Sequence, residues 1–350
     1  MADVPIPSDV PTPSGAPAPG GARVRPFVRG DRDQLTDLVN AHLSAVLPGS
    51  SVSVQGLLSS LEREPGEFVV DPWVVERRTL VAEQRSRVVA AAHLLRYGDD
   101  PNVGEHYRNT AEIRWLVCWT AAPFWPDAPA AGSALIRACT AQIRAWRVRS
   151  SYADGSLPGP GVYGVPEQWP HIAALYETAG YAGGRTEAVL VSSTARLLRD
   201  LRPPALDLRL CRTLGINGTR FSAHPLDAVS PGSQQEPVGY IEVDTNLGEA
   251  GRFSRGPGWA DVGNLFVEPT HRRRGVATWL LAHASRWLDL GGVGRLLTYV
   301  GEENGLGGGD VSSAGSAPNA AEHGEAAFWS AVGFEQLTRT RRMLARTGSG

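Results

Sequence analysis

The chain has 350 residues, of which 42% are hydrophobic and 20% are charged, and its formal net charge is -2. This composition is typical of a globular protein with one large domain or two ordinary ones, and it excludes a strongly basic nucleic-acid binder. The sequence contains no lysine, so all 34 basic residues are arginine. An arginine string in such a chain is therefore weak evidence for function by itself.

No window offers about 18 consecutive apolar residues, and the N-terminus lacks a basic segment followed by an apolar one. The three cysteines form no CxxC pair and are too few for a disulfide framework. We therefore expect a cytoplasmic protein with no membrane partner. Residues 1–21 are dominated by Pro, Ala, Gly and Ser, which predicts a disordered tail.

The first half alternates between strand and helix patterns. Apolar alternation predicts strands and helical spacing predicts helices. The expected order is a strand at 22–28, a helix at 31–47, strands at 79–84, 87–95 and 111–119, a helix at 130–146, a strand at 161–165 and a helix at 170–180.

The second half repeats part of this order after a proline-containing segment. The expected elements are strands at 206–214, 218–223, 237–243 and 259–267, a helix at 275–290, a strand at 295–300 and a helix at 321–334. AEIRWLVCWT (111–120) aligns with ADVGNLFVEP (260–269), and LYETAGY (175–181) aligns with FWSAVGF (328–334) at nearly the same separation. Coincidence in an alanine-rich chain is the alternative. The matches favour two homologous domains, at 22–192 and 205–346, joined by a linker at 193–204.

The stretch NLFVEPTHRRRGVATWLLA (264–282) predicts a strand, a tight basic turn and an amphipathic helix. The first amides of a helix have no intrahelical acceptor and lie at the positive end of its dipole. Gly275 has no side chain that would hold an anion away from them. The pattern therefore indicates a site for a phosphate group.

These residues resemble the GNAT superfamily of acyl-CoA N-acyltransferases. Arg272–Ala277 fits the family signature Q/R-x-x-G-x-G/A, LFVEP resembles the fourth strand and its turn, and FWSAVGF resembles the family's ending. The resemblance implies an α/β (α+β, GNAT-like) fold of two tandem domains, each a mixed, mostly antiparallel sheet flanked by helices. It also implies acetyl transfer from acetyl-CoA to a primary amine of a small molecule or protein, by direct attack in a ternary complex.

The resemblance further implies the residues that hold acetyl-CoA. The backbone of Phe266 and Val267 would pair with the pantetheine arm, and Asn319 or Asn304 would contact the pantetheine or its thiol. The turn and the first helical residues would bind the pyrophosphate and the adenosine phosphates: Arg272, Arg273, Arg274, Gly275, Val276 and Ala277.

Two carboxylates are candidates for the general base. Asp261 matches the position of the family's frequent glutamate, and strand alternation would place it on one face with Gly263, Leu265 and Val267. An exposed acid at a strand end is the equally weighted alternative. Glu242 is the second candidate, with a strand-surface residue as the favoured alternative.

The general acid is less defined. The family's tyrosine is replaced by Trp329, and Tyr299 is a substitute whose stronger alternative is a packing aromatic. Water or the exposed thiolate would then serve.

The first half has a different pattern. Tyr176 is in place and Glu112 aligns with Asp261, but Pro129 and Asp127 stand where the basic turn should be. Gly132–Ala134 keeps only the G-x-A spacing. We therefore expect a degenerate first domain that helps to shape the acceptor pocket.

Four further expectations concern partners and rival functions. A non-catalytic acyl-CoA sensor is the main rival reading, and a nucleic-acid module is disfavoured by the acidic balance. The histidines show no ligand spacing, which predicts no metal site. The protein is expected to act as a monomer or homodimer.

Overall fold

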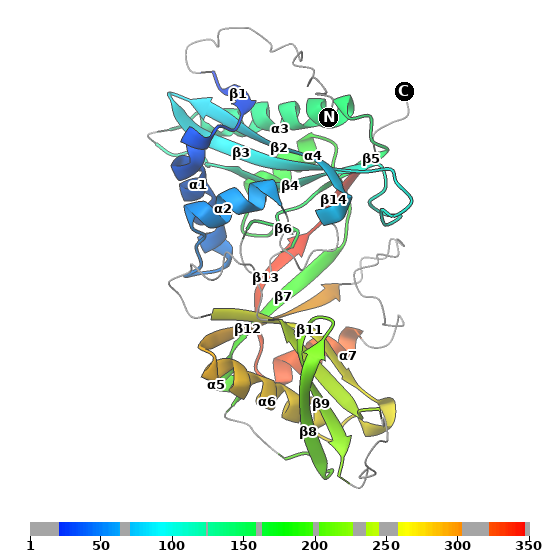
Figure 1. The fold of residues 1–350 in the computed structure, drawn as a ribbon. Coiled ribbons are helices and arrows are strands. Elements are labelled where there is room, and N and C mark those ends of the chain that lie inside the picture. Colours follow the sequence, from blue (N-terminus) through cyan, green and yellow to red (C-terminus); the bar gives the residue numbers. More distant parts are fainter. Residues whose placement is uncertain are drawn as a thin grey trace, which may run out of the picture.

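The computed structural model describes residues 21–63, 71–123, 125–158, 163–198, 203–226, 236–244, 258–302 and 322–346. Figure 1 shows two sheets with their own helices, one built mainly from the first half and one mainly from the second. Both sheets are mixed and mostly antiparallel, which confirms the predicted fold class.

The first sheet has six strands in the order β1-β2-β3-β4-β5-β14. Among the described strands of this sheet, only the β4–β5 pair is parallel. Its strands are β1 (Arg23–Pro26), β2 (Val74–Gln84), β3 (Arg87–Tyr97), β4 (Thr110–Cys118), β5 (Ser150–Ala153) and β14 (Met343–Arg346). The accompanying helices are η1 (Arg29–Asp31), α1 (Arg32–Val46), α2 (Val54–Glu62), η2 (Asp71–Trp73), α3 (Ala128–Ala145) and α4 (Pro170–Thr178).

The second sheet has eight strands in the order β6-β13-β7-β12-β11-β10-β9-β8. Its β11–β12 pair is parallel. The strands are β6 (Val165–Pro166), β7 (Thr186–Ser193), β8 (Leu208–Gly215), β9 (Gly218–Pro225), β10 (Gly239–Asp244), β11 (Gly258–Val267), β12 (Val293–Glu302) and β13 (Glu335–Arg341). Its helices are α5 (Thr194–Leu197), η4 (Pro269–His271), α6 (Val276–Leu290) and α7 (Glu322–Ala331).

The two sheets exchange strands across the predicted domain boundary. Strand β7 precedes the predicted linker at 193–204 but lies between β12 and β13 of the second sheet. Strand β14, at the other end of the chain, pairs with β5 of the first sheet. The predicted ranges 22–192 and 205–346 therefore remain a proposal about ancestry, because the observed sheets do not follow them.

Apolar patterning accounts for how the helices pack. Strand β4 is buried along its whole length, with α3 and α1 both packed against it. In α6 the buried residues recur at helical spacing and face the second sheet; they are Val276, Leu280, Leu281, Ala284 and Leu288. The helix predicted at 130–146 begins earlier, at Ala128, and α2, β5, β7, β13 and β14 were not predicted.

The described helices include none that is long and apolar enough to cross a membrane.

Candidate functional site

Strands β11 and β12 are parallel neighbours that diverge halfway along their length. Their registered pairs run from Gly258–Val293 to Asp261–Leu297. Beyond this point β11 keeps β10 on its other edge, and β12 continues to pair with β7. We call the pair Asp261–Leu297, where the divergence begins, the second apex.

The turn after β11 leads into α6 through two residues with left-handed backbone. Gly275 is the N-cap of α6, with φ +84°, and Arg273 has φ 60°. No side chain caps the helix, and the first bond back into the turn runs from the Trp279 amide to the Gly275 carbonyl, at 3.0 Å. The earlier amides of α6 have no intrahelical acceptor. Because Arg272 through Gly275 are exposed, these amides are open to an anion.

Hydrogen bonds hold this turn in place. The Arg272 Nε donates to the carbonyl of Val267 at 3.0 Å, which ties the turn to the end of β11. The Arg274 carbonyl accepts the Ala205 amide at 3.0 Å. A Cβ added at Gly275 would lie 3.4 Å from the Cα of Pro204. No local pattern predicts that Pro204 and Ala205, at the end of the predicted linker, support the turn.

The structure describes most of the residues predicted to hold acetyl-CoA, but not the two asparagines. Val267 and the segment Arg272–Ala277 lie together around the start of α6. The Phe266 side chain is 39% exposed and contacts Tyr240 of β10, with ring centroids 5.6 Å apart. Asn319 and Asn304 lie outside the described residues.

A β-bulge at Gly263 reverses the faces of β11. On β10, Val243 pairs with Val262 and Glu242 pairs with Asn264, so the register skips Gly263. Val262 and Leu265 therefore both pack in the core under α6. The prediction that Asp261 shares a face with Gly263, Leu265 and Val267 is wrong, because the inserted residue breaks the alternation.

Asp261 instead lies on the face of the second sheet that is turned toward the first half. Its neighbours Trp259 on β11 and Leu297 on β12 both belong to the core of the first half. Asp244 of β10 is its direct cross-strand partner. The half-buried Asp261 thus stands at the second apex, on the side where the two halves meet.

Tyr299 lies two residues beyond the second apex on β12. Its ring packs against that of Tyr163 from the first half, with centroids 5.7 Å apart. Burial raises the pKa of Tyr299 well above its ordinary value, and the nearby carboxylate of Asp261 raises it further. The phenol therefore keeps its proton at neutral pH.

Glu242 is buried rather than on the strand surface. It is 1% exposed, and its Oε1 accepts the Arg220 Nε at 2.6 Å. Its Oε2 accepts the backbone amide and the side-chain Nδ2 of Asn217, at 3.2 and 3.0 Å. These donors occupy both carboxylate oxygens, an arrangement suited to holding the β8–β9 turn.

Trp329 packs inside the second core. It is 2% exposed, and its ring contacts those of Phe328 and Phe334, with centroids 5.1 and 4.9 Å apart. Its indole has no acidic proton to give to a leaving group.

The first half contains the corresponding strands, β4 and β5. Their registered pairs run from Thr110–Ser150 to Ile113–Ala153. The register of β4 on β3 skips Arg114, the residue that aligns with Gly263, so the bulge is repeated. Glu112, paired with Tyr152, is therefore the structural counterpart of Asp261, and we call the pair Glu112–Tyr152 the first apex.

The helix start of the first half differs from that of α6. Helix α3 begins at Ala128, so Gly132 lies inside it rather than at its cap. A Cβ at Gly132 would meet the Cys118 Sγ at 2.8 Å and Leu175 at 2.9 Å. The G-x-A spacing of Gly132–Ala134 therefore does not form a cradle like that of α6. Asp127 stands at the N-cap and pairs with Arg85 at 3.0 Å.

Histidine side chains occupy the end of β4. The Cys118 amide donates to the His42 Nε2 at 3.3 Å, and the Cys118 carbonyl lies 3.1 Å from the His171 Nε2. Cys118 aligns with Val267, where the pantetheine arm is expected in the second half. Burial lowers the pKa of His42 to about 4, so it stays neutral as an acceptor.

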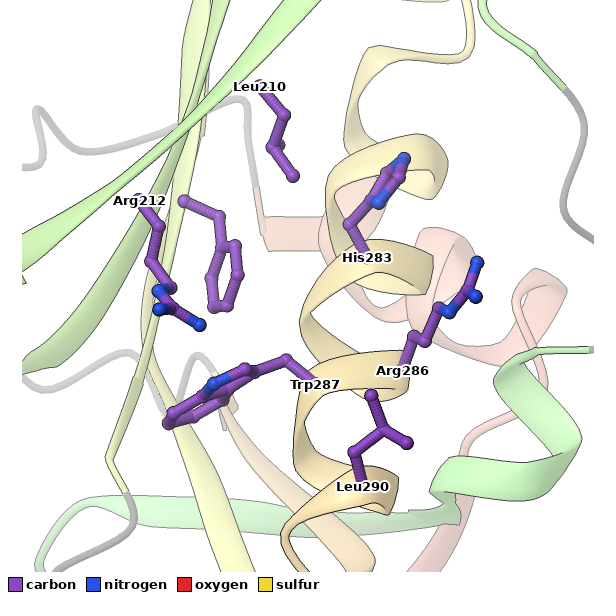
Figure 2. Close-up of a pocket in the computed structure, with 7 residues that line it drawn as sticks. Leu210, Arg212, His283, Arg286, Trp287 and Leu290 are labelled. Carbon is purple, nitrogen blue, oxygen red and sulfur yellow. The ribbon is translucent and has the colours of Figure 1, made fainter.

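An open groove of about 400 Å³ lies between α6 and the strands β8 and β9 (Figure 2). It is bordered by β8, β9 and α6 through Leu210, Arg212, Phe221, His283, Arg286, Trp287 and Leu290. None of the predicted site residues that the structure describes lines it. Among the described residues, no three His, Cys, Asp or Glu side chains gather in a way that would hold a metal ion.

Comparison with known proteins supports the resemblance seen in the sequence. Residues 218–305 match the Acetyltransferase (GNAT) family. A comparison with curated protein sequences gave no match.

Solved structures with the same architecture cover nearly the whole chain. A tandem GNAT protein from the clavulanic acid biosynthesis pathway is 17% identical, with a TM-score of 0.60, over 94% of this chain and 99% of its own. A GCN5-related N-acetyltransferase from Sphaerobacter thermophilus is 14% identical, with a TM-score of 0.55, over 94% and 96%.

A third similar structure is the glucosamine N-acetyltransferase region of a fungal multi-domain GH3 β-N-acetylglucosaminidase. It is 14% identical, with a TM-score of 0.58, over 96% of this chain and 40% of its own. Residues 218–305 thus match the GNAT family, and the chain as a whole has the fold of tandem GNAT proteins.

Proposed function

We propose that the protein is an acyl-CoA-dependent N-acyltransferase, and specifically an N-acetyltransferase that moves the acetyl group of acetyl-CoA to a primary amine of a small molecule or protein. The observation that carries the proposal is the start of α6. Its amides are exposed behind a left-handed Gly275, next to the point where β11 and β12 have separated.

The chemistry of this turn fits a diphosphate. The amides of Arg273–Ala277 would receive the pyrophosphate, and each charge-assisted bond contributes about 1.5–3 kcal/mol. Arg272 is a positioning residue, since its Nε holds the Val267 carbonyl. That carbonyl has a second lone pair, so pairing of Phe266 and Val267 with the pantetheine arm is compatible with the Arg272 contact. Acetyl-CoA supplies the activated thioester.

Asp261 is the proposed general base. A primary ammonium with a pKa near 10 is about three units from neutral at pH 7, which corresponds to roughly 4 kcal/mol. A carboxylate at the second apex would accept this proton directly or through a water. The neutral amine then attacks the thioester carbonyl, the C–S bond breaks, the thiolate leaves, and the nitrogen that is now bonded to the acetyl group releases its second proton to solvent water.

Tyr299 is the proposed proton donor for that thiolate. It retains its proton at neutral pH and lies close enough to Asp261 for the carboxylate to influence it. Glu242 is not proposed as the base, because Arg220 and Asn217 already occupy its oxygens.

The acceptor is proposed to enter between the two halves. Tyr163 of the first half contacts Tyr299, and the Arg295 Nη1 of β12 donates to the Pro48 carbonyl after α1 at 2.8 Å. Arg295 also lies over the ring of Trp259 at 4.6 Å. These contacts support the expectation that the first half helps to shape the acceptor pocket.

A non-catalytic acyl-CoA sensor is the second candidate, because Trp329 occupies the family's tyrosine position and is buried in the core. One experiment separates the two functions. Thermal stabilisation by acetyl-CoA and longer acyl-CoAs is measured first, followed by release of free CoA thiol across a panel of amines. The enzyme is expected to show both responses, with thiol release that depends on the amine. Stabilisation without amine-dependent release identifies a sensor, and no stabilisation by any acyl-CoA overturns both.

A further inference from the structure

The C-terminal segment carries one arginine from the second sheet into the first half. Strand β13 ends at Arg341 and β14 begins at Met343, so Arg342 is the single residue between them. The Arg342 amide donates to the Arg185 carbonyl at 3.1 Å. Pairing of Met343 with Ala153 then fixes the following strand beside β5.

The Arg342 guanidinium lies between two buried carboxylates. Its Nη2 is 3.4 Å from the Glu112 Oε1, and its Nε is 3.5 Å from the Asp154 Oδ2. Glu112 is fully buried and Asp154 is 3% exposed. The rings of Tyr152 and Tyr107 face the guanidinium, with centroids 4.7 and 5.6 Å from its central carbon. Two carboxylates and two aromatic faces form a site suited to a planar cation.

The position of this site corresponds to the proposed reaction centre of the second half. Glu112 at the first apex is the counterpart of Asp261. Asp154 lies two residues after Tyr152 on the β5 side, as Tyr299 lies two residues after Leu297 on β12. Arg342 therefore stands between the counterparts of the proposed base and the proposed acid.

We infer that the first half retains a cation-binding site where the second half receives its acceptor amine, and that Arg342 of the same chain is its built-in occupant. The comparison with the acceptor amine rests on the proposed function. The occupied guanidinium site itself rests on the contacts of Arg342. It follows that removing the Arg342 side chain leaves a site that binds an external guanidinium compound.

The test compares Arg342→Ala with Arg341→Ala in the full-length chain. Arg341 pairs with Glu177 on the surface, where the two side chains are 40% and 55% exposed. Loss of the buried guanidinium removes the cation beside Asp154 and leaves Glu112 with Arg114 and Tyr97, so the melting temperature of R342A is expected to fall by roughly 6–12 °C. R341A is expected to fall by less than about 2 °C.

Ethylguanidinium chloride is the probe for the vacated site. At about 20 mM it is expected to raise the melting temperature of R342A and leave the wild type and R341A unchanged, because ligand binding stabilises only a folded state with an open site. Urea at the same concentration is the neutral planar control, and sodium chloride controls for ionic strength. Arg342→Lys keeps a cation in place and is expected to show a smaller loss and no response to ethylguanidinium.

Two outcomes overturn the inference. One is an equal response of R342A to ethylguanidinium and to sodium chloride, and the other is a loss of stability in R342A no larger than in R341A. If R342A does not fold at all, its recovery of soluble, folded protein on refolding with ethylguanidinium but not with urea supports the inference, and failure of both contradicts it. Each readout is independent of acyl transfer, so failure of the proposed function does not alter the result.

Discussion

The two apices of this molecule share their backbone and differ in what fills them. In both halves two parallel strands separate after four registered pairs, and in both a bulge follows the carboxylate at the apex. At the second apex β11 runs on toward an exposed helix start. In the first half, Arg342 lies at the first apex, and His42 and His171 contact Cys118 at the end of β4. Under the proposed ancestry of two related domains, a site can be filled by side chains without loss of the sheet geometry around it.

The two halves also differ in how many ionisable side chains they bury. Among the described residues, the buried acidic and basic side chains of the first half are Asp31, His42, His93, Glu112, Arg114 and Asp154, and that of the second half is Glu242. Burial alone would raise the pKa of Glu112, but Arg342, Arg114 and the Tyr97 hydroxyl lower it to about 2. Glu112 is therefore a structural anion.

The largest expected contrast is between Asp261→Asn and Glu112→Gln. D261N removes the proposed base at the second apex, so kcat is expected to fall by about 10²–10⁴-fold, with the affinity for acetyl-CoA unchanged. E112Q breaks a buried ion pair at the first apex, so the free energy of unfolding is expected to fall by about 3 kcal/mol while kcat changes little. Steady-state kinetics and urea unfolding of both variants provide the measurements.

The predicted difference between the two apices is contradicted if D261N and E112Q change kcat and stability in the same way. A D261N protein with wild-type kcat would remove Asp261 from the chemistry. An E112Q protein with lost activity and normal stability would place a reaction centre in the first half. Thermal stabilisation of D261N by acetyl-CoA is the control that its cradle is intact.

Acid should destabilise the first half through its buried histidines. Burial lowers the pKa of His42 to about 4 and that of His93 to about 3, from an ordinary value of 6.5. The unfolded chain binds protons below pH 6.5 that these folded side chains do not, so stability is lost as the pH falls from 6.5 toward 4 and 3. At pH 5 each histidine lowers the free energy of unfolding by about 2 kcal/mol.

Urea unfolding at pH 7.5 and pH 5 measures this loss. His42→Gln and His93→Phe are each expected to remove about half of the histidine contribution. His224→Gln, on β9 of the second half, is the matched control and should leave the loss unchanged. Asp154 acts in the opposite direction, because burial raises its pKa and its protonation favours the folded state as the pH falls. Unchanged pH dependence in both H42Q and H93F would contradict the histidine explanation.

The structural features that depend on local sequence patterns were predictable from the sequence. The strand, turn and helix of β11 and α6 arise from alternation, a glycine and helical spacing, and all lie within one short segment. The position of Asp261 was predicted, but its face was not, because a one-residue bulge at Gly263 leaves no pattern that distinguishes it from regular alternation.

Long-range pairing was not predictable from one sequence. Strand β7 lies in the second sheet because it pairs with β12 and β13, more than a hundred residues away. Arg342 is one of many arginines, and nothing local distinguishes it from its neighbour Arg341. Arg342 has a role because the pairing of β14 with β5 places it beside Glu112 and Asp154. The arginine triplet, by contrast, stands out in the sequence. In the structure Arg272 holds the turn through the Val267 carbonyl, and Gly275 leaves the first amides of α6 exposed.

The prediction with the smallest expected effect tests whether the exposed start of α6 is the feature that distinguishes the second half from the first in binding acetyl-CoA. Gly275→Ala and Gly292→Ala place the same methyl group at left-handed positions, with φ +84° and +77°. Both should lose about 1–2 kcal/mol of stability, since an L-residue is strained there. Only G275A should weaken acetyl-CoA, by about tenfold, which corresponds to the loss of roughly one hydrogen bond. Calorimetric titration of both variants measures this, and equal affinities would show that the backbone at Gly275 does not form the phosphate cradle.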